Sequence, residues 1–254
     1  MEYSDIIYEK KDGVATITLN RPQALNAINL QIFKEMKEAL NDIASDETIG
    51  IVVLTGSGRA FSAGVDIKSM GDGEDVTRAE RTKIALDVIA AIENLEKPVI
   101  ASVNGYCLTG ALELATACDL IIASENASFG DTHARWGLTP TWGGSQRLPR
   151  IVGAMKAKEM VFTCEMLTAR EALQIGLVNK VVEPEKLGEA VQEMAKKILA
   201  NSRQSISVQK KLMNRGLKMD YGSALKMAEK ESPGPTSDSK ARLQSFKEKS
   251  KGKS

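Results

Sequence analysis

Two segments rich in small residues carry the groups of this sequence that are best suited to chemistry. The first is Arg59-Ala-Phe-Ser-Ala-Gly-Val-Asp-Ile-Lys68, and the second is Asn104-Gly-Tyr-Cys-Leu-Thr-Gly-Ala-Leu-Glu-Leu-Ala115. Each follows a short apolar run that we expect to be a β-strand. Loops at the carboxyl ends of strands form the ligand crevice in α/β sheets. We therefore expect both segments to contribute to one binding site.

Backbone N–H groups in these segments form a candidate pair of hydrogen-bond donors. Gly110 is expected to begin a helix, where N–H groups have no partner within the helix and the helix dipole favours negative charge. A second N–H from the turn at Gly64 and Val65 would complete an oxyanion hole. Such a pair suits a thioester oxygen that becomes an enolate, and each donor is worth roughly 3–4 kcal/mol.

Glu113 is the candidate proton carrier beside these donors. It lies in the first turn of the expected helix, between the apolar residues Leu112 and Leu114. A carboxylate there can move a proton on the carbon next to the activated carbonyl. The alternative is that Glu113 is an acidic residue that only complements the positive end of the helix dipole.

Other familiar catalytic motifs are absent from the sequence. Gly105–Gly110 has the glycine spacing of a phosphate-binding loop, but Ala111 and Leu112 stand where such a loop needs Lys and Ser or Thr. Gly56-Ser-Gly58 lacks the third glycine of a dinucleotide loop, and no Gly-x-Ser-x-Gly sequence occurs. The single histidine, His133, excludes sites that need two, and we expect no metal site.

Alternating strands and helices must position these groups. Apolar runs predict strands over 14–19, 51–54, 98–103, 119–123 and 177–182. Helical spacing and capping residues predict separate helices. One begins after Asn29, another ends near Leu95, and two more cover 110–117 and 168–176. From about Glu185 onward the pattern is helical, with an interruption at 232–235. This order predicts an α/β fold with parallel strands and a helical C-terminal part.

Composition limits the class of protein. The chain has 254 residues, of which 43% are hydrophobic and 26% charged, as in soluble globular proteins. No apolar run is long enough for a membrane span, and the N-terminus lacks the features of a signal peptide. Three cysteines without a Cys-x-x-Cys motif indicate buried thiols in a reducing compartment, so we expect a cytoplasmic protein.

The charge of the chain is unevenly distributed. Residues 201–254 contain 13 Lys and Arg against 5 Asp and Glu, although the net charge of the whole chain is only +1. This basic segment is either a solvated helical surface with a lysine-rich tail or a site for an anion such as a nucleotide phosphate. Composition alone does not decide between the two.

Several motifs together resemble the enoyl-CoA hydratase/isomerase, or crotonase, superfamily, from Val14 to about Lys249. They are Asn20-Arg-Pro-Gln-Ala-Leu-Asn26, Ala60–Lys68, Ala101–Gly110, Glu113-Leu-Ala with Cys118-Asp119, Gly143-Gly-Ser-Gln-Arg-Leu148 and Ala172-Leu-Gln-Ile-Gly-Leu-Val178. The resemblance implies a crotonase-like spiral of ββα turns with a helical C-terminal trimerisation region. We expect residues 1–195 to form the spiral core, with residues 196–254 covering the site and packing between subunits.

The resemblance also implies ligands and site residues. The substrate would be an acyl-CoA thioester, with no further cofactor, and the assembly a homotrimer or a hexamer made of two trimers. The oxyanion N–H groups would be those of Val65 and Gly110. The residues expected to contact coenzyme A or the acyl group are Ala24, Ala63, Gly64, Asp66, Ile67, Lys68, Trp136, Trp142 and Lys249. The basic C-terminal helices would cover the coenzyme A.

The sequence departs from the family pattern at one catalytic position. Typical hydratases have a second glutamate twenty residues after the first, in a Phe-Gly-x-x-Glu stretch. Here the stretch is Phe129-Gly-Asp-Thr-His133. His133 either replaces the missing acid/base, because an unperturbed imidazole titrates near neutrality, or is a hydrogen-bonded pocket residue beside Asp131. The stretch Ser232-Pro-Gly-Pro235 also shortens the usual helical connection.

The leading functional hypothesis is an enoyl-CoA hydratase that adds water to a 2,3-enoyl-CoA through an enolate. One alternative is an isomerase, or another crotonase-type hydrolase or lyase, that uses Glu113 alone. A different class is an RNA-associated or scaffold protein. Gly110 and Glu113 are retained, and the basic tail lacks the interleaved aromatic residues that stack on bases, so nucleic acid is not the expected partner.

Overall fold

A computed structural model describes residues 3–67 and 77–251. In these residues the larger sheet has six strands, in the order β1-β2-β3-β5-β7-β10. Strand β1 is antiparallel to β2, and all other neighbours are parallel. The strands are β1 (Ile6–Lys11), β2 (Val14–Leu19), β3 (Ile51–Gly56), β5 (Val99–Val103), β7 (Leu120–Ser124) and β10 (Lys180–Val182).

A smaller sheet follows the same progression. Within the described residues its order is β4-β6-β8-β9, with β4, β6 and β8 parallel and β9 antiparallel to β8. Its strands are β4 (Ala60–Ser62), β6 (Tyr106–Leu108), β8 (Ser128–Gly130) and β9 (Leu167–Thr168). The chain passes β3-β4-α2, then β5-β6-α3, then β7-β8-α4, so each turn adds one strand to each sheet. The predicted spiral of ββα turns is confirmed.

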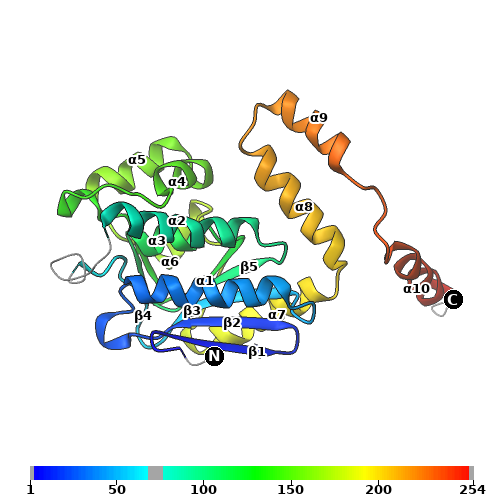
Figure 1. Cartoon of the computed structure of the whole chain (residues 1–254), viewed down its shortest axis with the longest axis horizontal. Coiled ribbons are helices and arrows are strands. Elements are labelled where there is room, and N and C mark those ends of the chain that lie inside the picture. The colour runs from blue at the N-terminus through cyan, green and yellow to red at the C-terminus, as the bar shows by residue number, and fades with distance from the viewer. Residues whose placement is uncertain (1–2, 68–76, 252–254) are drawn as a thin grey trace.

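Helices cover both faces of the larger sheet (Figure 1). On one face α1 buries the predicted stripe Ile32, Phe33, Met36, Leu40 and Ile43, and the Asn29 side chain caps the helix by accepting from the Ile32 N–H at 2.8 Å. On the other face α7 packs against Val14, Ile51 and Val53. The continuous apolar strand β3 is therefore buried on both sides. The helices that precede residue 200 are α1 (Leu30–Ser45), α2 (Arg78–Asn94), α3 (Gly110–Ala115), α4 (Gly144–Val152), α5 (Ala154–Thr163), α6 (Ala169–Gln174) and α7 (Leu187–Leu199).

Two sequence-based expectations need correction. The strand expected over 177–182 begins only at Lys180, because the N–H groups of Leu177 and Val178 turn back to the carbonyl of Ala172 at the end of α6. The segment 104–109, expected to be a loop, contains β6. A strand of three residues is too short for its side-chain alternation to be visible in the sequence.

The last quarter of the chain is helical, as predicted. It contains α8 (Arg203–Gly216), α9 (Tyr221–Glu231) and α10 (Ser239–Lys251), and the break between α9 and α10 includes Ser232-Pro-Gly-Pro235. In Figure 1 these helices reach away from the sheets. No helix in the described ranges has both the length and the apolar character that crossing a membrane requires.

An ion pair between a buried lysine and a half-buried aspartate attaches α8 to the core. The Lys210 ammonium lies 2.7 Å from the Asp119 carboxylate and also donates to the carbonyls of Lys97 and Ile92. The Lys210 side chain is only 7% exposed and that of Asp119 is 23% exposed, so the lysine is buried and the carboxylate remains partly open to solvent. Burial raises the pKa of the Asp119 carboxyl, and Lys210 opposes that shift.

We expect Lys210→Met to lower the free energy of unfolding by roughly 2 kcal/mol at neutral pH, because it leaves the half-buried Asp119 carboxylate without its cation. Without Lys210 the pKa of Asp119 rises further, so the loss should shrink as the pH falls and the carboxyl becomes protonated. Urea unfolding of both proteins at neutral and mildly acidic pH measures this difference. Lys211→Met, at the exposed neighbouring position, is the matched control. An equal loss in both variants would contradict the assignment.

Candidate active site

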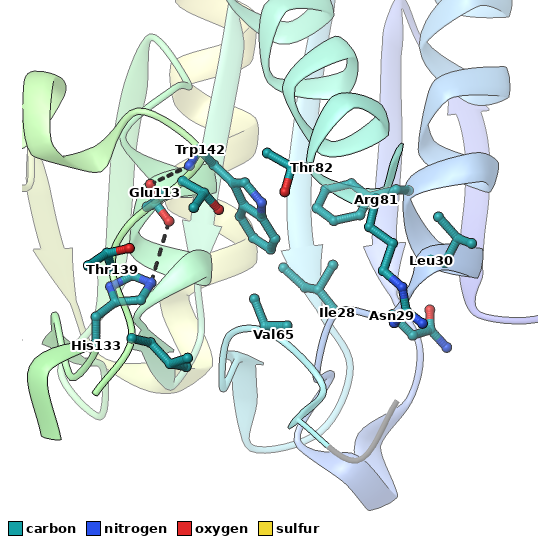
Figure 2. Close-up of a pocket in the computed structure, with 13 residues that line it drawn as sticks. Ile28, Asn29, Leu30, Val65, Arg81, Thr82, Glu113, His133, Thr139 and Trp142 are labelled. Atoms are coloured by element: carbon teal, nitrogen blue, oxygen red, sulfur yellow. Dashed lines mark hydrogen bonds and ion pairs between the residues drawn. The ribbon is translucent and has the colours of Figure 1, made fainter. Parts of the chain in front are cut away.

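One pocket gathers residues from segments that lie far apart in the sequence. Its volume is roughly 760 Å³, including space open to solvent. Four of the site residues predicted from the sequence line this pocket, namely Val65, Glu113, His133 and Trp142. Figure 2 shows Glu113 and His133 together on one side of the pocket and Arg81 on the other. Ile28 and Phe33 add apolar wall, so the pocket combines two titratable side chains with a surface suited to an acyl chain.

Glu113 is held through one oxygen and faces the pocket with the other. Its Oε1 accepts hydrogen bonds from the N–H groups of Trp142 and Gly144, both at 2.8 Å. Its Oε2 lies 3.6 Å from His133 Nε2. Burial raises the pKa of the Glu113 carboxyl, and the Gly144 N–H is the largest opposing influence. Glu113 is therefore a rigidly placed carboxyl group with one oxygen available for proton exchange.

His133 lies between two acidic side chains. Its Nδ1 is 2.6 Å from Asp131 Oδ1, and its backbone N–H donates to the same oxygen at 3.1 Å. Its Nε2 faces Glu113. The His133 side chain thus contacts Asp131 and also lines the pocket opposite Glu113. This position is compatible with both alternatives from the sequence, an acid/base and a hydrogen-bonded pocket residue.

The two predicted oxyanion donors occupy different structural settings. Ile28 N–H donates to the Gly64 carbonyl at 2.7 Å, and Asp66 N–H donates to the Ile28 carbonyl at 3.0 Å. Backbone groups of an extended segment alternate in direction, so the Val65 N–H points away from Ile28. Gly110 is the first residue of α3. Neither N–H donates a backbone hydrogen bond within the ranges that the structure describes.

The Trp142 indole lies directly beside Gly110. A Cβ atom at position 110 would lie 2.4 Å from Trp142 Cζ3, so only glycine fits there. The indole also packs edge-on against Phe33, with ring centroids 4.9 Å apart. Trp142 is 5% exposed and lines the pocket, whereas Trp136 is 63% exposed and is not part of the pocket wall. Trp136, which was expected to contact coenzyme A or the acyl group, thus lies outside the described pocket wall.

Five of the remaining residues expected to bind coenzyme A lie in two paired segments beside Val65, namely Ala24, Ala63, Gly64, Asp66 and Ile67. Ala63 N–H donates to the carbonyl of Leu25, next to Ala24, and the Asp66 carboxylate lies 2.8 Å from the Arg21 guanidinium. Gly64 is joined to the other segment through Ile28, and Ile67 is 54% exposed. Lys68 lies outside the described residues, and Lys249 is described only as part of the backbone of α10.

The loop that holds Glu113 was not predicted from the sequence. Gly143, with φ +93°, turns the chain so that the N–H groups on either side of it reach the same carboxylate oxygen. The Arg147 guanidinium donates to the carbonyls of Trp142 and Glu113 and pairs with Glu93 at 2.9 Å. The motif Gly143–Leu148 was visible in the sequence, but nothing local links it to a glutamate about thirty residues earlier.

Gly144→Ala should reduce kcat roughly tenfold, because small displacements of a catalytic group are costly. Its Cβ would lie 2.7 Å from Glu113 Cγ, so the carboxyl group must move. Steady-state kinetics on an enoyl thioester measure the loss. The matched control is Gly188→Ala in α7, where an added Cβ meets nothing within 4 Å. Equal kcat values in the two variants would contradict the positioning of Glu113 by this loop.

Comparison with known proteins places this geometry in a family. The family model for enoyl-CoA hydratase/isomerase matches residues 9–253. The short-chain-enoyl-CoA hydratase of Clostridium acetobutylicum is 43% identical, covering 99% of this chain and 97% of its own. The crotonyl-CoA hydratase of Syntrophomonas wolfei is 40% identical, covering 99% and 98%. The crystal structure of an enoyl-CoA hydratase from Bacillus anthracis superposes with a TM-score of 0.92 at 34% identity over 97% of both chains. With its spiral of ββα turns and a family match over nearly its whole length, the chain belongs to the enoyl-CoA hydratase/isomerase family.

Proposed function

We propose that this protein is an enoyl-CoA hydratase that adds water across the 2,3-double bond of a short-chain 2-enoyl-CoA. The observation that carries the proposal is the opposition of Glu113 Oε2 and His133 Nε2, 3.6 Å apart in the pocket wall. Both atoms can lie within about 2.8 Å of one water molecule placed to the side of the line that joins them. The names of the two relatives support the reaction and the short acyl chain.

The reaction requires the pair to hold one proton between its two members. One member takes a proton from water as the water oxygen bonds to C3, and the π electrons of the double bond move onto the thioester oxygen. The other member gives its proton to C2 as the enolate collapses. Proton exchange between Nε2 and Oε2 then restores the starting state, so the net change is the addition of one water molecule.

The thioester oxygen needs donors as its charge develops. We assign this role to the N–H groups of Val65 and Gly110, which stand at the pocket edge and at the start of α3. The pantetheine and adenine of the substrate would lie along Ala24 and residues 63–68, with Trp142 and Phe33 lining the acyl end. Coenzyme A is part of the substrate, and we assign no separate cofactor.

Isomerisation by Glu113 alone is the second candidate activity. A single base could carry a proton between C2 and C4 without water. The presence of His133 beside Glu113 favours hydration, because a second proton carrier is what the addition of water needs. The RNA-associated alternative has no corresponding observation in the pocket.

Hydration of crotonyl-CoA tests the proposal directly. We expect loss of the conjugated enoyl absorbance with formation of the 3-hydroxyacyl-CoA, and slower turnover as the acyl chain lengthens. Calorimetry should show saturable binding of acetyl-CoA that weakens with added salt, because phosphates meet Lys and Arg. No binding of acetyl-CoA up to millimolar concentration, or salt-dependent binding of RNA without any hydration, would overturn the proposal.

We further propose that residues 196–254 pack between subunits of a cytoplasmic homotrimer or hexamer, while residues 1–195 form the catalytic core. The three cysteines are free thiols, consistent with a reducing compartment. Large apolar side chains on the C-terminal helices and at the end of α8 are exposed in the single chain, including Met213 at 61%, Leu217 at 70% and Leu243 at 60%. Exposure of this kind is typical of surfaces that a partner covers.

Sedimentation velocity should therefore give a trimer or hexamer at micromolar concentration. Replacing Leu217 and Leu243 together by Glu should shift the distribution toward smaller species, because charge is costly in a buried contact. The same double replacement at exposed Lys211 and Lys240 is the control. A strict monomer for the unmodified chain would refute the proposed assembly.

A further inference from the structure

We propose that Asp131 is a positioning residue that keeps the proton of neutral His133 on Nδ1, so that Nε2 is the ring atom that exchanges protons in the pocket. The proposal rests on the proposed function, since it describes how His133 is prepared for hydration. Asp131 is not part of the described pocket wall, so it acts only through the imidazole.

The hydrogen bonds of Asp131 determine which ring nitrogen carries the hydrogen. Asp131 is 3% exposed, and its Oδ1 receives both the backbone N–H of His133 at 3.1 Å and Nδ1 at 2.6 Å. Oδ1 already accepts a hydrogen bond from the backbone N–H, and an ionised carboxylate carries no hydrogen that it could donate to the ring. Nδ1 must therefore be the donor, which leaves the lone pair of a neutral ring on Nε2.

The charges around the ring give this arrangement a chemical effect. Asp131 approaches from the turn after β8, and Glu113 approaches from α3 on the opposite edge of the ring. The charged side chain that completes the described pocket wall is Arg81 from α2, across the cavity in Figure 2. A carboxylate in direct contact with Nδ1 stabilises the imidazolium that forms when Nε2 takes a proton, and it does so without contacting substrate.

Asparagine at position 131 separates the hydrogen-bond acceptor of the Asp131 side chain from its negative charge. Its amide oxygen can still accept from the His133 backbone N–H, so the turn that Trp136 and Leu138 close by donating to the His133 carbonyl is preserved. Its negative charge is lost, so the oxygen that faces Nδ1 becomes a weaker, neutral acceptor, and in the opposite amide orientation the N–H₂ group faces Nδ1 and cannot accept from it. The variant Asp131→Asn thus keeps the shape of the site and weakens the preference for a hydrogen on Nδ1.

The single histidine makes the tautomer directly measurable. The chain contains only His133, so the untagged protein labelled with nitrogen-15 at histidine gives ring signals from that residue alone. We expect the neutral ring of the wild type to show a protonated Nδ1 and an unprotonated Nε2, and Asp131→Asn to show a mixture. A wild-type ring with its hydrogen on Nε2, or an unchanged tautomer in the variant, would overturn the proposal. This measurement needs no turnover, so it stands apart from the test of the hydratase activity.

Kinetics provide the second arm of the test. Asp131→Asn should lower kcat by between about 10-fold and 100-fold with little change in KM, and should move the pH profile of kcat toward lower pH. The shift has this sign because removing a negative charge beside the ring makes each protonated state of the pair harder to form. In a His133→Ala background Asp131→Asn should cost nothing further. An equal additional loss in that background would mean that Asp131 is only structural.

Discussion

Glu113→Gln is expected to lower kcat for hydration by about 100-fold or more while leaving acetyl-CoA binding nearly unchanged. The amide oxygen of glutamine can still accept from the N–H groups of Trp142 and Gly144, so the side chain keeps its place. Its amide nitrogen would stand opposite His133 and cannot take up or release the reacting proton at neutral pH. Steady-state kinetics and calorimetry on the same preparations separate the loss of chemistry from any loss of binding.

A second buried glutamate provides the matched control for this substitution. Glu35 is 4% exposed and accepts from the backbone N–H groups of Ser4, Asp5 and Ile6, outside the pocket wall. Glu35→Gln should weaken the attachment of the N-terminal segment and leave kcat unchanged. If Glu113→Gln turned over as fast as Glu35→Gln, Glu113 would have no part in the mechanism.

His133→Ala should cost roughly 100-fold in kcat and remove one limb of the pH–rate profile. The imidazole is one of the two groups that must share a proton, and alanine leaves Glu113 as the only proton carrier that the described pocket wall offers beside the reacting atoms. The variant contains no histidine, so any titration that remains in its profile belongs to another group. The measurement is kcat for crotonyl-CoA across the pH range in which the protein stays folded.

Two further substitutions distinguish catalysis by His133 from a role in shaping the pocket. His133→Glu restores the pair of carboxyl groups found in typical hydratases and should recover part of the rate lost in His133→Ala. His133→Asn keeps size and polarity without titrating, and it should be as slow as the alanine variant. A normal kcat and an intact profile in His133→Ala would leave Glu113 working alone, as an isomerase requires.

The pattern of residues along the chain was enough to predict the main elements and to single out the two residues that we propose as proton carriers. The strands over 14–19 and 51–54 were predicted because burial on one face produces alternating apolar residues and burial on both faces produces a continuous apolar run. Both patterns are visible in a few neighbouring residues. Asn29 was predicted as a cap because its side chain bonds to an N–H three residues away. Glu113 stood out for its residue type and apolar neighbours, and His133 because it occupies the position of the second glutamate in the family that the chain resembles. The fold places the two side chains face to face.

What the pattern could not supply were contacts between segments distant along the chain. The N–H groups that hold Glu113 come from Trp142 and Gly144, and their approach depends on the left-handed turn at Gly143. The exposure of Trp136 and the burial of Trp142 follow from the path of the same connection, although the two residues have the same type. Backbone amides have no residue identity, so only the tertiary structure decides which of them meet a given carboxylate. For the same reason the direction of the Asp131 side chain, and with it the tautomer of His133, is a property of the folded chain.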